Sequence, residues 1–74
     1  MALRNSIRRY RFEQSEMTQE ALANAVDVTR QTIHSIETGK FIPSTLLALK
    51  IAKVFHKSVE EVFFIEEPNN RKEK

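Results

Sequence analysis

The sequence predicts an all-α fold, a compact domain of five short helices, with a short extended segment as an option near the C-terminal end. Apolar residues recur every three or four positions along most of the chain, as expected of helices that each bury one face. Four of these runs follow a hydroxyl residue that can cap the start of a helix: Thr18, Thr29, Ser44 and Ser58.

Length and composition limit the class of protein. Seventy-four residues make one domain with a modest core, near the size at which oligomerisation often adds needed stability. The absence of cysteine excludes disulfides, thiolate metal sites and cysteine catalysis. No stretch is apolar for long enough to span a membrane and the start does not resemble a signal peptide, so a cytoplasmic protein is expected.

The formal net charge of +2 is unevenly distributed. Residues 1–57 hold nine Lys or Arg against five acids, residues 58–67 hold four acids and no base, and residues 68–74 hold three bases and one acid. The basic excess lies in the body of the chain, as a polyanionic partner requires, although the excess is mild. We expect one domain over residues 1–67 and a flexible charged tail over residues 68–74.

The first helix is expected over residues 3–13, with Leu3, Ile7 and Tyr10 on its inner face. Phe12 does not fit that face, so we expect it to be partly exposed or to cover the link that follows. The segment also holds four arginines, which either contact phosphates or form a solvated basic face: Arg4, Arg8, Arg9 and Arg11.

Residues 18–38 are predicted to form two helices joined by a tight turn. Their apolar faces are Leu22, Ala23 and Val26 in the first helix, and Ile33 and Ile36 in the second. Asp27 stands where a left-handed residue would end the first helix, a conformation that Asp tolerates better than most residues. Gly39 is placed to end the second helix. This pattern is typical of a helix-turn-helix.

The second of these helices has an outer face unlike that of an ordinary surface helix, because its only acid is Glu37, near its end. A step of about 100° per residue turns these polar side chains outward or to the flanks: Arg30, Gln31, Thr32, His34, Ser35 and Thr38. Arg suits the guanine edge, Gln the adenine edge, and Thr or Ser suit bases or phosphates. Either this helix enters the DNA major groove or it is a polar helix that happens to lack acids, and the agreement of geometry with chemistry favours DNA.

Three positions around this helix are candidates for contacts to the DNA backbone. The Gln19 amide can reach a phosphate from the start of the preceding helix, although Gln is also simply a good helix former. Lys40 follows Gly39 and either binds a phosphate or is a surface lysine near a helix C-terminus. His34 is expected to face DNA or solvent.

A long apolar helix is expected over residues 45–56, and a capping box of Ser58 and Glu61 predicts a last helix after it. The loop before residue 45 holds two large apolar residues that are expected to anchor it to the core, Phe41 and Ile42. Two leucines widen the apolar arc of the long helix and predict that it is covered on two sides, Leu46 and Leu49.

The segment Phe63-Phe64-Ile65 ends the predicted domain. Two adjacent Phe residues cannot both enter one small core from a single helix, so one of them, with Ile65, is expected to be exposed and to form a homodimer contact. The alternatives are that FFIEE runs as a short strand pairing with its mate, or that Phe64 packs on the first helix. A Phe64→Glu change is predicted to give a monomer with weakened DNA binding, and an intact dimer would move the interface to Leu46 and Leu49.

Taken together, these motifs resemble the phage-repressor/Cro-like (Xre-type) helix-turn-helix family of small bacterial, archaeal and phage transcription regulators. The resemblance runs from about Leu3 to Phe64. It rests on Arg11, the runs MTQEALANAV and VTRQTIHSIETGK, the pair Pro43-Ser44, and the runs LLALKIAKVF and SVEEVF.

The resemblance implies a lambda-repressor-like fold and DNA binding. It also implies that Arg11 forms a structural ion pair with Glu37, and that Gln19 contacts the DNA backbone. Two features depart from the family pattern. Asp27 replaces the usual glycine of the turn, and the link around Ser15-Glu16 is one residue longer than usual and lacks its glycine.

Nothing in the sequence indicates catalysis or a metal. His34 and His56 are far apart in sequence with no carboxylate at a ligand spacing, and a single glycine excludes a phosphate-binding glycine loop. We therefore expect no enzyme and no cofactor.

The predicted function is that of a transcription regulator, a repressor rather than an activator, which binds an inverted-repeat operator as a homodimer. The expected base contacts are Arg30, Gln31, Ser35, Thr29 and Thr32; the backbone contacts are Gln19, Lys40 and His34; and the dimer contacts are Phe63, Phe64 and Ile65. The alternative is the antitoxin of a toxin–antitoxin pair, or an interaction module, whose exposed C-terminal end binds a partner protein.

Overall fold

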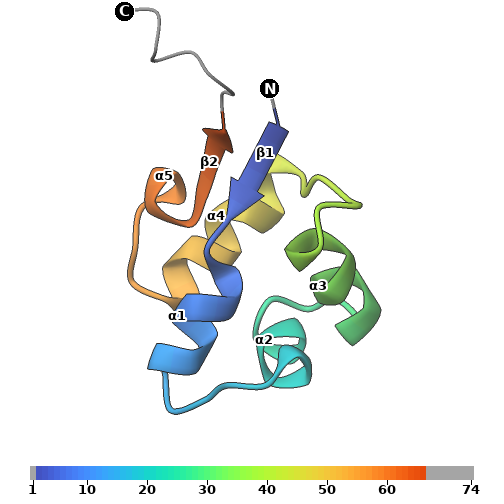
Figure 1. The fold of residues 1–74 in the computed structure, drawn as a ribbon. Coiled ribbons are helices and arrows are strands. Elements are labelled where there is room, and N and C mark those ends of the chain that lie inside the picture. Colours follow the sequence, from blue (N-terminus) through green and yellow to red (C-terminus); the bar gives the residue numbers. More distant parts are fainter. Residues whose placement is uncertain (1, 67–74) are drawn as a thin grey trace, which may run out of the picture.

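The computed structural model describes residues 2–66, which form five helices and two strands (Figure 1). In chain order these are β1 (Ala2–Asn5), α1 (Ile7–Glu13), α2 (Gln19–Ala25), α3 (Arg30–Glu37), α4 (Thr45–Val54), α5 (Val59–Val62) and β2 (Phe63–Glu66). The five predicted helices are confirmed, but the fold is not purely α, because the two strands form a small antiparallel sheet. The predicted tail lies outside the described residues.

The sheet replaces the first turn of the predicted first helix. In it, Leu3 lies opposite Ile65. Helix α1 begins at Ile7 because the backbone of residues 2–5 bonds to β2, and because Asn5 Oδ1 accepts the Ile7 N–H (3.1 Å). The predicted helix start at residue 3 was therefore wrong. The optional extended segment at the C-terminal end is present, and within this chain its pairing partner is β1 (Figure 1).

The four predicted helix caps are confirmed. Each hydroxyl accepts the backbone N–H three residues on: Thr18 from Ala21 (2.9 Å), Thr29 from Thr32 (3.2 Å), Ser44 from Leu47 (3.1 Å) and Ser58 from Glu61 (3.2 Å). The capping box is also present, since the Ser58 N–H donates to Glu61 Oε1 (2.8 Å). This bond from the Ser58 backbone favours the charged carboxylate and so lowers the pKa of Glu61 below its ordinary value of 4.5.

The turns use left-handed residues where the sequence predicts them. Asp27 has φ 64° at the end of α2, and Gly39 has φ 82° after α3. The long link between α1 and α2 contains two consecutive left-handed residues, Ser15 (φ 57°) and Glu16 (φ 56°). This is how the chain turns there without the glycine usual in the family it resembles.

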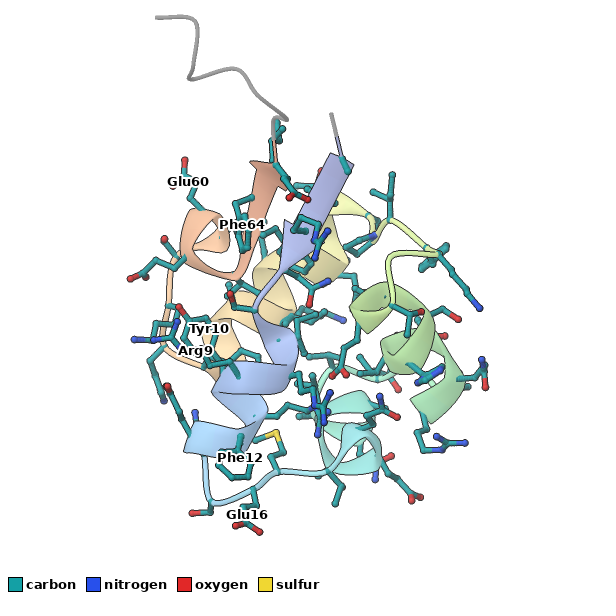
Figure 2. The ribbon with its side chains drawn as sticks, in the orientation of Figure 1. Arg9, Tyr10, Phe12, Glu16, Glu60 and Phe64 are labelled. Atoms are coloured by element: carbon teal, nitrogen blue, oxygen red, sulfur yellow. The ribbon has the colours of Figure 1, made fainter. Side chains whose placement is uncertain are left out.

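The core takes residues from every helix and from β2. Its members are Ile7, Leu22, Ala23, Val26, Ile33, Ile36, Ile51, Ala52, Phe55, Val62 and Phe63, with Leu3 and Tyr10 partly buried against it. Phe12 is 68% exposed beside the α1–α2 link, as predicted (Figure 2). None of the helices in residues 2–66 is long and apolar enough to cross a membrane.

The prediction that the loop before α4 is anchored in the core was wrong. Phe41 and Ile42 are 49% and 69% exposed instead of buried, because their loop is held against the end of α3 by the N–H groups of Lys40 and Phe41, which donate to Ser35 O (2.9 and 3.2 Å). Helix α4 is covered on one side only in this chain. The two leucines on its open side, Leu46 and Leu49, are 63% and 52% exposed.

Candidate nucleic-acid interface

Helices α2 and α3 form the predicted helix-turn-helix. Ala23 lies at the contact between them with 1% exposure, so a larger side chain there would force the helices apart. The Val28 N–H donates to Ala23 O (2.9 Å) and closes the turn around Asp27. The turn fixes the direction in which α3 leaves, with its inner face on the core and its outer face free.

The outer face of α3 carries the predicted polar set. Ile33 and Ile36 are buried, while Arg30, Gln31, His34 and Thr38 are exposed and Thr32 and Ser35 are half-buried. Helical geometry divides this face in two. Arg30, His34 and Glu37 lie on the flank next to α2, and Thr29, Thr32 and Ser35 lie on the flank next to the loop after Gly39.

Glu37, the only acid of α3, is turned inward. Arg11 donates from Nε to Glu37 Oε2 (2.6 Å) and from a terminal nitrogen to Oε1 (3.1 Å), and the two side chains are 14% and 8% exposed. Arg11 also donates to Met17 O (2.7 Å), which ties α1 to the start of α2. The ion pair implied by the family resemblance is therefore present. It removes the one negative charge that would otherwise oppose a phosphate backbone at α3.

Gln19 joins this ion pair to the outer face. Its amide nitrogen donates to Glu37 Oε1 (3.1 Å) and lies 3.3 Å from Nδ1 of His34, while its amide oxygen accepts from Arg30 (3.3 Å). A nitrogen of an amide can only donate, so in this contact His34 Nδ1 is the acceptor. Both amide hydrogens of Gln19 are thus in use, and a phosphate contact from Gln19 has to replace the bond to His34.

The other flank of α3 borders a hollow of about 340 Å³. Its walls are Thr29, Gln31, Thr32 and Ser35 of the α3 region, and Lys40 and Phe41 of the following loop. The hydroxyl oxygens of Thr29 and Thr32 lie 3.0 Å apart, so one of the two hydroxyls donates to the other. Lys40 is exposed at the rim, where its ammonium group is accessible to a phosphate.

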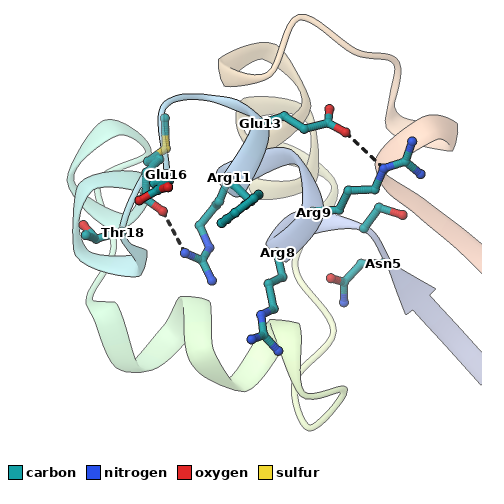
Figure 3. Close-up of a pocket in the computed structure, with 10 residues that line it drawn as sticks. Asn5, Arg8, Arg9, Arg11, Glu13, Glu16 and Thr18 are labelled. Atoms are coloured by element: carbon teal, nitrogen blue, oxygen red, sulfur yellow. Dashed lines mark hydrogen bonds and ion pairs between the residues drawn. The ribbon is translucent and has the colours of Figure 1, made fainter.

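The arginines of α1 differ in direction (Figure 3). Arg8 and Arg11 extend toward α3, while Arg9 extends to the other side of α1. There it donates to Glu13 (3.2 Å) and lies over the Tyr10 ring (5.8 Å from its centre). Arg8 and Arg9 are both exposed and both border a hollow of about 680 Å³ between α1 and the link to α2, so only their directions distinguish them. The direction of the side chains therefore favours a phosphate contact from Arg8 over one from Arg9.

Comparison with known proteins agrees with this geometry. Residues 7–62 match the protein family described as Helix-turn-helix. The chain belongs to this helix-turn-helix family. It is 54% identical over 52 residues to YgzD, named as an uncharacterized HTH-type transcriptional regulator of Bacillus subtilis, and the match covers 70% of this chain and 79% of that protein. Over 65 residues it is 45% identical to HTH-type transcriptional regulators of Archaeoglobus fulgidus and Methanocaldococcus jannaschii, with 88% of this chain covered and 90% and 97% of theirs.

As an Xre/Cro-like helix-turn-helix protein, the chain is a DNA-binding transcriptional regulator and not an enzyme. Within residues 2–66 no three His, Asp or Glu side chains are grouped so as to hold a metal ion. The candidate functional site of this DNA-binding protein is the surface around α3.

Sequence reasoning missed two residues beside this helix-turn-helix. Asn5 caps α1 through its side-chain oxygen and donates from its amide to Ile36 O (3.0 Å), so it links the sheet to the end of α3. An Asn two residues before Ile7 is a capping signal that was hidden by the helical spacing of Leu3 and Ile7. Phe41 was assigned to the core, although its position directly after Lys40 already placed it beside α3.

Proposed function

We propose that this chain is a sequence-specific repressor that binds an inverted-repeat operator as a homodimer, with α3 in the major groove. The observation that carries the proposal is the state of Glu37. The only carboxylate of α3 is withdrawn from the outer face and neutralised by Arg11, which leaves only uncharged and basic side chains on that face. A surface helix that merely faced solvent would gain stability from this pair, but it would have no use for an outer face free of negative charge.

The proposed contacts follow the two flanks of α3. Arg30, Gln31 and Ser35 read base edges, and Thr29 and Thr32 contact phosphate or a thymine methyl. The backbone contacts, which fix the register, are Gln19, Lys40 and His34. The bond from Arg30 to the Gln19 oxygen supports a shared role, because it holds the guanidinium in one orientation before DNA arrives.

A matched pair of variants tests this function. Arg30→Ala and Arg9→Ala remove the same charge, but only Arg30 lies on α3, whereas Arg9 pairs with Glu13 on the far side of α1. We expect Arg30→Ala to weaken binding to a selected operator about 10- to 100-fold, the range for loss of one good base contact. Arg9→Ala should stay within about twofold. Equal losses in a gel-shift titration would mean that only overall charge matters and would defeat the proposal.

The dimer is proposed to form on the face that contains Ile65, Leu46 and Leu49. Successive side chains of a strand alternate, so Ile65 shares a face with its partner Leu3, and Phe64 lies on the opposite face. Leu3 and Leu49 line one hollow of about 370 Å³, so Leu49 of α4 lies beside the face of the sheet that carries Leu3.

Phe63 and Phe64, the other two residues predicted to form the dimer contact, do not lie on this exposed face. Phe63 is 7% exposed and belongs to the core, so it supports the proposed face from beneath. Phe64 is 44% exposed, and Figure 2 shows its ring beside β2, on the side of α5. A dimer that uses the Ile65 face leaves Phe64 free, and the antitoxin alternative then finds its one supporting observation here, as an apolar site for a partner protein.

Two charge-introducing variants separate these surfaces. We expect Leu49→Glu to give a monomer in analytical ultracentrifugation, with weakened operator binding, because two half-sites need two linked copies of α3 about 34 Å apart. Phe64→Glu should remain dimeric, which revises the expectation from the sequence alone that this change gives a monomer. A dimeric Leu49→Glu with a monomeric Phe64→Glu would instead assign the interface to Phe64. If both variants remained dimeric, the interface would lie elsewhere.

Repression is proposed over activation because it requires no function besides DNA binding. Occupying a promoter excludes RNA polymerase without any further contact, whereas activation requires a surface that recruits it. The comparison is a reporter gene behind the bound promoter. Expression should fall when the wild-type chain is supplied and should not fall with Arg30→Ala.

A further inference from the structure

An exposed aromatic ring stands beside the base-reading face of α3. Phe41 is 49% exposed, and with Lys40 it forms one wall of the hollow of about 340 Å³ whose other wall includes Gln31, Thr32 and Ser35. The hollow therefore opens on the same face as the proposed base contacts. An aromatic ring on an otherwise polar binding face calls for an apolar group in the ligand.

The backbone of Phe41 is fixed to α3. Its N–H and that of Lys40 both donate to Ser35 O (3.2 and 2.9 Å), and the left-handed Gly39 (φ 82°) turns the chain into that position. The loop therefore holds the base of the ring at a set distance from Ser35, as a reading side chain requires.

The other contents of the hollow match an apolar ligand group at a DNA surface. The hydroxyls of Thr29 and Thr32 lie 3.0 Å apart and share one hydrogen bond, so only one of the two hydroxyl hydrogens remains for a ligand. Lys40 at the rim supplies a positive charge for the adjacent phosphate. In the major groove the one apolar group on a base edge is the methyl at C5 of a pyrimidine.

We propose that Phe41 reads the C5-methyl group of one pyrimidine in each operator half-site, with Ser35 and Thr32 lining the same hollow. This inference rests on the proposed function, since it requires that α3 enter the major groove. The methyl belongs to thymine in unmodified DNA and to 5-methylcytosine in modified DNA. Phe41 thereby adds a specificity position outside α3.

The test is a double-mutant cycle between protein and DNA. The probe is a duplex that the wild-type chain selects from random sequence, with each thymine replaced singly by deoxyuridine, which deletes only the methyl. We expect one replacement per half-site to weaken wild-type binding about fourfold, the effect of losing one buried carbon group. Phe41→Ala should bind the unmodified probe about as weakly and should ignore that replacement. Phe41→Leu should keep part of the response.

A second arm replaces each cytosine by 5-methylcytosine. A gain in affinity that depends on Phe41, with no effect of deoxyuridine, would also support the proposal and would identify the modified base as the source of the methyl. If neither replacement distinguishes wild type from Phe41→Ala, the proposal is overturned. The proposal is also overturned if Phe41→Ala is monomeric and the wild-type affinity does not depend on any C5-methyl group. The ring would then act in dimer formation.

Two control variants keep the outcomes apart. Ile42→Ala alters the neighbouring exposed residue, which does not line the hollow beside Gln31 and Ser35, so its methyl response should equal that of the wild type. Arg30→Ala on the same probes tests the proposed function itself. If Arg30→Ala weakens binding while the base replacements affect wild type and Phe41→Ala equally, the proposed regulator function is supported and only the proposed role of Phe41 is rejected.

Discussion

Replacing Arg11 by Met should remove a large part of the stability of this domain. The Glu37 side chain is 8% exposed with Arg11 in place, and the change leaves the Gln19 N–H as the one remaining side-chain partner of its carboxylate among the described residues. Leaving one member of a buried ion pair without its partner costs about 3 kcal/mol or more. A chain of this length has a total stability of about 4 to 11 kcal/mol. We therefore expect the midpoint of thermal unfolding to fall by about 12 to 24 °C.

The reverse change, Glu37→Gln, should cost less. Arg11 is 14% exposed, keeps its bond to Met17 O, and can still donate to the amide oxygen of the new Gln. We expect a loss of about 1 to 2 kcal/mol, the range for a weakened charged hydrogen bond. The ranking of the two variants is therefore a more specific prediction than either magnitude.

The assay is thermal and urea unfolding followed by circular dichroism at one fixed protein concentration, because assembly would add to the apparent stability. The control is Arg9→Met, which removes an exposed i,i+4 pair with Glu13 and should cost about 0.5 kcal/mol or less. An Arg11→Met chain within 0.5 kcal/mol of the wild type would refute the reasoning, since it would show that water satisfies Glu37 as well as Arg11 does.

Four further predictions concern single positions. The lowered pKa of Glu61 means that its stabilising effect is complete above pH 4.5 and is lost as the pH falls through the folded-state pKa, so the stability gap between wild type and Glu61→Gln should close in acid unfolding series. Asp27→Gly should raise the free energy of unfolding by about 0.5 to 1 kcal/mol, since glycine has no penalty at φ 64°, and a urea titration showing a loss would contradict this. Gly39→Ala should lower it by about 1 kcal/mol through backbone strain alone, because an added Cβ would meet nothing within 4 Å. Lys40→Ala should weaken binding to all duplexes alike and reduce the slope of log affinity against log salt by about 1, and a sequence-dependent loss would instead make Lys40 a base contact.

The parts of the fold that depend on neighbouring residues could be predicted from the sequence. Caps such as Thr18 and Ser58, and the left-handed turn at Asp27, act over three or four positions, and all were confirmed. The sheet could not be predicted in the same way. Leu3 and Ile65 are far apart in sequence, and the spacing of Leu3 from Ile7 fits a helix equally well, so only the tertiary pairing decides.

In the candidate site too, local features could be predicted from the sequence and contacts between elements could not. The outward set on α3 followed from helical periodicity, and the Arg11–Glu37 pair followed from the family resemblance. The bond between Gln19 and Arg30 joins two helices, so it depends on how the helices cross. The exposure of Phe41 was missed because an aromatic residue in a short loop usually anchors that loop, and here backbone bonds to Ser35 O do so instead.

The most direct test of a dimeric, sequence-specific regulator is footprinting on the DNA just upstream of its gene, titrated against random duplex at several salt concentrations. We predict one protected region over a two-fold symmetric sequence, tight binding that persists at salt concentrations which release random duplex, and loss of protection with Arg30→Ala. Equal, weak and strongly salt-dependent binding to both duplexes would contradict the account, because it would reduce the surface of α3 to an attraction for phosphate.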